Sequence, residues 1–269
     1  MKRHLPTIFM AASFALPPKV VERSWTQEER QKLYPSASVS AANVEVINPD
    51  PQFNGLFRYD RARDELVWVK ADGNEAVHWN SRTRASHTKT LKGGERTLDA
   101  YRPDTGARLK TKRGSWELLK NVLYFIPDSS DGNPLWNLPV ADDLVNLQVD
   151  KDRSTWMGLS THPNKLYHLF WIPGSRRDEA LLEVLNWDVA GELVAWQPCA
   201  EGKSILSENT GTSAEPVVKL YSLRANDKIR TLDVESVAEV KGYSATAVAP
   251  RTCSEVYLAT AKGVLRVSR

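Results

Sequence analysis

The sequence predicts an all-β protein, and three observations support this prediction. From about residue 40, short runs rich in β-branched and aromatic residues are separated by turn signals at roughly the 8–12-residue spacing of all-β folds. The chain also holds nine tryptophans and eight tyrosines, a high number for 269 residues. Only one segment before the C-terminal half carries a clear helix signature. With 41% apolar and 26% charged residues, the chain is not disordered, and it contains no apolar run of 18 residues that would span a membrane.

The N-terminal 40 residues are predicted to form an arm and a short helix. Thr26 and Glu29 have the spacing of a capping box, which predicts a helix at residues 27–34 that Pro35 ends. The apolar segment 8–16 is interpreted as a strand or packing arm. The alternative is a secretory signal peptide, because residues 1–4 are basic and residues 13–15, within the apolar segment, have the small-x-small pattern of a cleavage site. The cytoplasm is slightly favoured over secretion as the compartment.

The strands are predicted in order along the remaining chain. Asp, Asn and Gly turns separate these apolar and aromatic runs. Residues 81–94 are polar, contain Gly93 and Gly94, and are predicted to be a loop. The predicted strands are residues 55–59, 66–69, 76–79, 97–101, 107–111, 121–126, 165–172, 183–187, 192–196, 217–223, 228–234, 244–249, 255–260 and 264–267.

The spacing of the strands favours a β-propeller of five to six blades. Aromatic strand centres recur after 36 to 67 residues, with a mean of 50, at Phe57, Tyr124, Tyr167, Tyr221 and Tyr257. A four-stranded blade needs roughly 40–50 residues. The last blade shows only three strands, so we expect the N-terminal apolar arm to supply the fourth. Residues 1–269 are then one propeller domain, and a β-sandwich or a two-domain β protein is the alternative.

Two segments resemble blades of the six-bladed fungal fucose-binding lectins of the Aleuria type. They are residues 217–222 with 226–230, and residues 55–59 with 65–69. In that family an Arg, a Glu and a Trp or Tyr from neighbouring blades bind one sugar. The resemblance places Lys219 where the strand Arg stands, with Arg230 or Thr231 near the expected Glu. Arg58 can take the Arg role, although its downstream Glu is out of register. The resemblance therefore implies the fold more strongly than fucose binding.

The predicted ligand-binding residues follow from this resemblance and from the aromatic content. Tryptophans stack on the apolar faces of sugars, but they also fill gaps between sheets. Trp79 and Trp136 lie beside polar turns and are the better candidates for exposure. The candidate ligand-binding residues are Trp79, Trp136, Arg58, Glu65, Lys219 and Tyr221.

Residues 82–113 form a basic stretch. They contain ten Lys and Arg against three Asp and Glu, a net charge of +7, which leaves −4 for the rest of the chain. This concentration of positive charge would bind an anionic macromolecule. It is equally typical of solvent-exposed edge strands, where Lys and Arg discourage pairing with another chain. The candidate residues for an anionic partner are Arg108, Lys110, Lys112 and Arg113.

No catalytic or metal-binding motif stands out. The five histidines lack ligand spacing, and the acidic turns at 128–133 and 150–152 lack a complete calcium loop, so neither a metal nor a cofactor is expected. A propeller enzyme would gather acidic and imidazole groups in its central channel, and the residues to check there are His78, His168, Asp188 and Glu183. Cys199 and Cys253 either pair between adjacent blades or remain free thiols.

Three function hypotheses follow. The first is a non-enzymatic binding module, with carbohydrate or another small molecule bound between blades. The second is a propeller enzyme, a hydrolase, lyase or isomerase, with a central acidic-His pocket. The third is a scaffold that binds an anionic partner through residues 82–113. The lack of catalytic motifs favours a protein that is not an enzyme, and the sequence does not determine the oligomeric state.

Overall fold

Five separate β-sheets make up the described protein. The computed structural model describes residues 18–33, 42–49, 53–70, 73–91, 108–119, 121–140, 144–150, 155–161, 164–171, 180–187, 191–199, 203–226 and 231–269. Each sheet is a meander in which consecutive strands pair antiparallel. Five meanders in chain order are the blades of a β-propeller, which confirms the predicted fold class and excludes a two-sheet sandwich.

Blade 1 comprises β3 (Phe53–Asp60), β4 (Glu65–Lys70), β5 (Glu75–Asn80) and β6 (Ser86–Thr90). Blade 2 comprises β7 (Arg108–Lys110), β8 (Gly114–Leu119), β9 (Val122–Pro127) and β10 (Trp136–Pro139). Blade 3 comprises β11 (Leu144–Asp150), β12 (Thr155–Thr161), β13 (Asn164–Trp171) and β14 (Ala180–Trp187). Blade 4 comprises β15 (Glu192–Pro198), β16 (Lys203–Gly211), β17 (Pro216–Asn226) and β18 (Thr231–Lys241). Blade 5 comprises β19 (Ala245–Pro250), β20 (Glu255–Thr260) and β21 (Gly263–Ser268).

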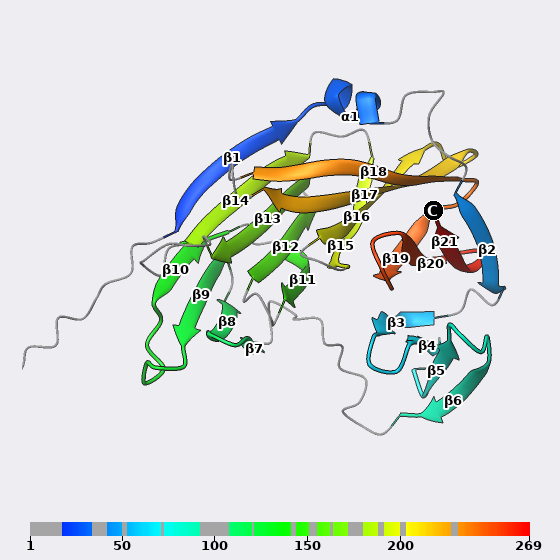
Figure 1. The fold of residues 1–269 in the computed structure, drawn as a ribbon, viewed down its shortest axis with the longest axis horizontal. Helices are drawn as coiled ribbons and strands as arrows, with labels where there is room; N and C mark the ends of the chain where they lie inside the picture. Colours follow the sequence, from blue (N-terminus) through cyan, green and yellow to red (C-terminus); the bar gives the residue numbers. More distant parts are fainter. Residues whose placement is uncertain are drawn as a thin grey trace, which may run out of the picture.

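The blades follow one another in an arc from blade 2 through blades 3, 4 and 5 to blade 1 (Figure 1). A hydrophobic core joins each neighbouring pair in this order. The first strands β11, β15, β19 and β3 contact one another in succession, as the inner strands of propeller blades do. Among the described residues, no core cluster joins blade 1 directly to blade 2.

Packing on both faces explains the sequence of the central strands. A blade inside the arc is covered on each side by a neighbour, so its strands are apolar throughout rather than alternating. Strand β14, with the sequence ALLEVLNW, is buried at seven of its eight positions. Trp116, Trp156, Trp187 and Trp196 are among the largest fully buried side chains, and they fill the wedges between blades.

Two N-terminal strands complete two different blades. Strand β2 (Asn43–Asn48) pairs antiparallel with β21 and becomes the fourth strand of blade 5. We expected the N-terminal apolar segment 8–16 to supply the fourth strand of the last blade. Strand β2 supplies it instead, and segment 8–16 lies outside the described residues. Strand β1 (Lys19–Trp25) pairs parallel with β14 and adds a fifth strand to blade 3.

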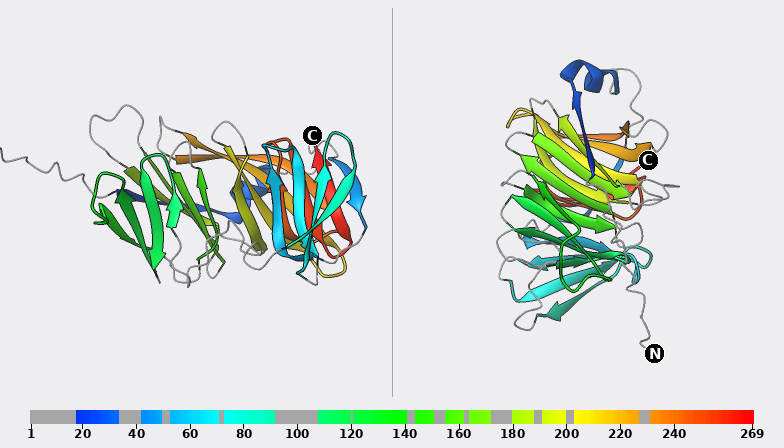
Figure 2. Two further views of the ribbon diagram at one scale, coloured as in Figure 1. Left: turned by 90° about the horizontal axis from the view of Figure 1, so that it is seen from below. Right: turned by 90° about the vertical axis from the view of Figure 1, so that its left-hand side faces the viewer.

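The predicted capping box is confirmed in helix α1 (Gln27–Leu33), which stands outside the sheets (Figure 2). The Glu29 amide donates to Thr26 Oγ1 at 3.2 Å, and the Thr26 amide donates to Glu29 Oε2 at 2.9 Å. No helix of the described ranges is both long enough and apolar enough to span a membrane.

The predicted loop at 81–94 is partly wrong, because β6 occupies residues 86–90. Its residues are all exposed, so it has no apolar face that the sequence could reveal. The predicted strand 97–101 and the candidate Asp188 lie outside the described residues. The cysteines, which the sequence left open, form a Cys199–Cys253 disulfide between blades 4 and 5.

Candidate functional site

The two tryptophans expected at the surface are buried. Trp79 is 6% exposed and Trp136 is 4% exposed, so the prediction that they are accessible is wrong. Trp79 packs edge-on against Tyr257, and Trp136 packs against Trp116 and Phe125. They lie in the cores that join blades 5 and 1 and blades 2 and 3. A polar turn nearby indicates the end of a strand, but the end of a strand is still covered when the next blade packs over it.

The other candidate ligand-binding residues do not form one pocket. Tyr221 is buried, and its hydroxyl donates to Glu208 Oε2 at 2.9 Å. Lys219 is half-buried on β17 of blade 4, opposite Glu208 and Glu239 in the sheet register. Arg58 and Glu65 lie on β3 and β4 of blade 1, whereas Lys219 and Tyr221 lie in blade 4.

The basic stretch is divided between two blades. Arg82 and Arg84 lie in the β5–β6 turn of blade 1 and approach Asp64 at 3.9 Å and Glu45 at 3.1 Å. Lys110 on β7 pairs with Asp128, and the exposed Lys112 and Arg113 follow in the turn to β8. Arg108 is the first residue of β7. Arg82 and Lys110 are therefore partly neutralised by carboxylates of their own blades, and Arg84 by Glu45 on β2 of blade 5.

One expected acid–imidazole pair is buried between blades. His168 and Glu183 are cross-strand neighbours on β13 and β14, with exposures of 7% and 0%. The ring of His168 meets Trp196 of blade 4 edge-on at 5.7 Å between centroids. Both side chains are thus part of the interface between blades 3 and 4, and a substrate would not reach them without separating these blades.

A second pair is more accessible and lies in blade 1. His78 Nδ1 is 3.0 Å from Glu65 Oε2, and the His78 ring stacks on the His87 ring with 4.9 Å between centroids. The Glu65 and His78 side chains are 14% and 10% exposed, whereas His87 is exposed. Sequence reasoning assigned Glu65 to a sugar site and His78 to a catalytic pocket, and it gave His87 no role.

A network of ion pairs connects blade 5 to blade 1. Arg251 Nε and Nη2 donate to the two carboxylate oxygens of Asp64 at 3.1 and 3.3 Å. Arg251 also donates to Glu255 at 3.1 Å, and Arg266 donates to both oxygens of Glu255 at 3.1 Å. This network links the β3–β4 turn to the β19–β20 turn and to β21.

Hydrogen bonds within this network shift two carboxyl groups toward their charged form. The Tyr59 hydroxyl donates to Asp64, and together with Ser81 and Arg251 it lowers the pKa of Asp64 despite partial burial. Burial raises the pKa of Glu255, but bonds from Arg266 and Tyr257 and the nearby charges outweigh it and give a lowered pKa. Burial and the bond to Asp64 raise the pKa of Tyr59 to about 12. Every one of these groups is held by partners, which is typical of a structural network.

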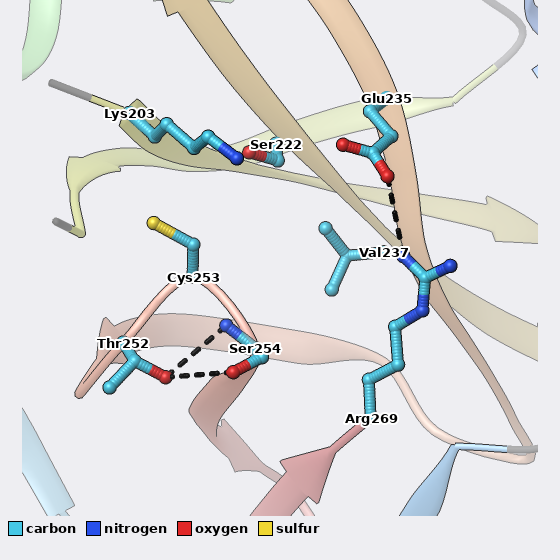
Figure 3. A pocket seen from close by; sticks show the side chains of 8 residues that line it. All are labelled: Lys203, Ser222, Glu235, Val237, Thr252, Cys253, Ser254 and Arg269. Atoms are coloured by element: carbon cyan, nitrogen blue, oxygen red, sulfur yellow. Dashed lines mark hydrogen bonds and ion pairs between the residues drawn. The ribbon is translucent and has the colours of Figure 1, made fainter. Parts of the chain in front are cut away.

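A cleft of about 400 Å³ opens between blades 4 and 5 (Figure 3). Blade 4 contributes β16, β17 and β18, and blade 5 contributes the β19–β20 turn and the residue after β21. Arg269 donates to Glu235 at 3.4 Å across the opening, and the Thr252 hydroxyl lies 3.2 Å from that of Ser254. The lining residues are Lys203, Ser222, Glu235, Val237, Thr252, Cys253, Ser254 and Arg269.

Cys253 lines this cleft, and its disulfide partner Cys199 is buried in the connection between β15 and β16. Sequence reasoning expected pockets between blades, but of the lining residues it named only Cys253, and only as half of a possible disulfide. Their signal was weak, since Lys203, Thr252 and Ser254 stand in turns or at strand ends and resemble ordinary solvated residues.

Comparison with known proteins identifies no family. No protein-family model matches the chain, and no curated protein sequence matches it. Solved structures similar to it include a gluconolactonase from Xanthomonas campestris, with 12% identity, a TM-score of 0.46, and coverage of 87% of this chain and 91% of that one. A putative gluconolactonase gives 10% identity, a TM-score of 0.45, and coverage of 87% and 93%. The Nup133 β-propeller domain from Vanderwaltozyma polyspora gives 8% identity, a TM-score of 0.31, and coverage of 87% and 83%. The fold assignment rests on the five sheets themselves.

Proposed function

We propose that this propeller is a binding module and that the cleft between blades 4 and 5 is its ligand site. The observation that supports this proposal is the lining of the cleft. Two cations, Lys203 and Arg269, and three hydroxyl groups surround a space of about 400 Å³. This volume lies within the range of small-molecule sites, which is about 300–1,000 Å³.

The charges of the lining favour an anionic ligand. Glu235 is already paired with Arg269, whereas Lys203 forms no ion pair with any residue of the described ranges. Ser222 is a buried residue of the lining, and Val237 and Cys253 supply apolar surface. The ligand class that fits is a small hydroxylated molecule with a carboxylate or phosphate group. Lys203 would bind the anionic group, and the hydroxyls of Ser222, Thr252 and Ser254 would bond the polar remainder.

A neutral sugar is less well supported than an anionic one. Sugar binding through stacking needs an exposed aromatic face, and no aromatic residue lines the cleft. Eight of the nine tryptophans are buried, and the side chain of the ninth, Trp171, is not described. Among carbohydrates, the proposed ligands of this cleft are therefore acidic or phosphorylated sugars.

Calorimetric titration tests the proposal directly. The probes are glucuronate and glucose 6-phosphate as anionic ligands, with glucose and fucose as neutral counterparts. We expect saturable binding of an anionic probe that Lys203→Gln weakens at least tenfold and that Lys241→Gln leaves unchanged. Lys241 is the matched control, because it is an exposed lysine of the same blade that does not line the cleft. Equal binding by Lys203→Gln and wild type would place the site elsewhere, and no binding of any probe would contradict a sugar-acid site.

The second candidate is a hydrolytic enzyme, which the contact between Glu65 and His78 favours. A carboxylate that holds an imidazole at 3.0 Å is the arrangement of a general base. The test is hydrolysis of a panel of ester and lactone substrates by wild type and by His78→Gln. Turnover that disappears in His78→Gln supports the enzyme, and turnover that persists in it shows that this pair is not the catalytic one.

A further inference from the structure

Three potential metal ligands share one face of blade 1. Leu66, Val77 and Trp79 lie in the core shared with blade 5. Side chains alternate between the faces of a strand, so Glu65 on β4 and His78 on β5 point to the opposite face. His87 on β6 is the direct cross-strand partner of His78 and therefore shares that face. Three neighbouring strands thus present a carboxylate and two imidazoles side by side.

The three side chains are close enough to bind one ion. One ligand atom from each of Glu65, His78 and His87 lies within 4.8 Å of the others. Metal–ligand bonds of about 2.0–2.2 Å in a tetrahedral site require ligand atoms about 3.4 Å apart. His78 Nδ1 and Glu65 Oε2 are already 3.0 Å apart, so binding an ion mainly requires the His87 ring to move closer to them. His87 is exposed, and its ring can turn from the stack toward the other two ligands without disturbing a core.

We infer that Glu65, His78 and His87 form a binding site for Zn²⁺. Two imidazoles and one carboxylate are a ligand set that zinc uses in proteins, with the fourth position left to water or an added ligand. Imidazole nitrogen also suits copper and nickel, whereas calcium and magnesium prefer all-oxygen sites. The inference is independent of the ligand proposed for the cleft between blades 4 and 5, since the two sites share no residue. It competes with the general-base role of Glu65 and His78, because a ligand atom bound to Zn²⁺ cannot accept a proton.

The carboxylate of Glu65 is needed for charge as well as for coordination. Arg58 lies in the same cross-strand row, opposite Val67, and Lys89 lies two residues beyond His87 on β6. Arg58 and Lys89 therefore lie on the same face as the site, and their positive charges would repel a bound metal ion. Glu65 supplies the negative charge that offsets them, so its loss should weaken binding at least as strongly as the loss of His87.

Titration of the metal-free protein, residues 1–269, with Zn²⁺ tests this inference. We expect one ion per chain in calorimetry, and visible absorption bands of tetrahedral coordination when Co²⁺ replaces Zn²⁺. The variants His87→Ala and Glu65→Gln should each raise the Kd at least tenfold. Thr88→Ala is the control, because Thr88 is the exposed neighbour of His87 and points to the other face of β6.

The outcomes separate binding from folding. Circular dichroism melts of the metal-free variants report whether the blade is intact, and His87→Ala should melt as wild type does because His87 buries little surface. Absence of stoichiometric Zn²⁺ binding to wild type would overturn the inference. Binding that survives in both His87→Ala and Glu65→Gln would also overturn it, since the ion would then lie elsewhere.

Discussion

Cys199 and Cys253 form a disulfide that ties the β15–β16 connection of blade 4 to the β19–β20 connection of blade 5. The two residues are 54 positions apart, and the chain between them contains the other three strands of blade 4 and the first strand of blade 5. The bond therefore limits the separation of two blades whose interface also holds the cleft.

Removing this disulfide should destabilise the protein. Closing a loop of this length reduces the entropy of the unfolded chain, which in the chain-entropy model stabilises the native state by about 4 kcal/mol. We expect the double variant Cys199→Ala/Cys253→Ala to unfold at lower denaturant concentration, and wild type in reductant to behave in the same way. The measurement is chemical unfolding followed by tryptophan fluorescence. A double variant with the same midpoint as oxidised wild type would show that the bond is absent or contributes nothing.

Acid should weaken the junction between blades 5 and 1. The pKa of Asp64 is lowered in the folded protein, so the unfolded chain binds the proton more readily. The stability contributed by this carboxylate is present above its unfolded pKa of 3.8 and is lost as the pH falls through the lower folded value. Thermal unfolding of wild type from pH 6 to pH 3 should show this loss. Asp64→Asn should be less stable at pH 6 and should depend less on pH below 4, and an unchanged pH dependence would contradict the role of Asp64.

Alkali should act on the same junction through Tyr59. Its pKa is raised from 10.0 to about 12, since burial and the bond to Asp64 favour the neutral phenol. Between these values the unfolded chain has released a proton that the native state still holds, so stability falls as the pH rises from about 10 to about 12. Ultraviolet titration of tyrosinate should show a late-titrating group that Tyr59→Phe removes. A difference between the wild-type and Tyr59→Phe curves with its midpoint near pH 10 would show that Tyr59 titrates normally.

The fold was predictable because its signals are local. The capping box of Thr26 and Glu29 lies within four residues, and the apolar strands and their turns repeat along the chain. The exposed strand β6 was missed because it is polar on both faces, and β16 was missed because its polar Ser204, Ser207 and Glu208 are buried against neighbouring strands. Strands β6 and β16 are therefore recognised by their hydrogen-bonded pairing with neighbouring strands, which the pattern of side chains does not show.

The candidate sites were less predictable because they depend on contacts between strands and blades. Trp79 looks exposed in the sequence because a polar turn follows it, but the packing of blade 5 buries it. His78 and His87 are nine residues apart, which is not a helical ligand spacing, and only the β5–β6 register places them opposite each other. The cleft combines β16 with the last residue, Arg269, and no local pattern connects them.

The buried carboxylate of Glu208 should be essential for the interface between blades 3 and 4. Glu208 is 1% exposed, and its Oε2 accepts bonds from the Tyr221 hydroxyl at 2.9 Å and from Trp187 Nε1 of blade 3 at 3.4 Å. Glu208→Ala removes the acceptor and leaves two buried donors, each of which costs about 1–3 kcal/mol when unpaired. Glu208→Gln keeps one carbonyl oxygen in place and should cost less.

Chemical unfolding of the two variants distinguishes hydrogen bonding from side-chain volume. We expect the loss of stability to be larger for Glu208→Ala than for Glu208→Gln, with Tyr221→Phe giving a smaller loss because it removes one donor and leaves the acceptor with Trp187. Trp187 and Tyr221 pack edge-on at 5.0 Å, so a shift in tryptophan emission of the folded Glu208→Ala variant should accompany the change. Equal stability of Glu208→Ala and wild type would show that the carboxylate does not hold the two blades together.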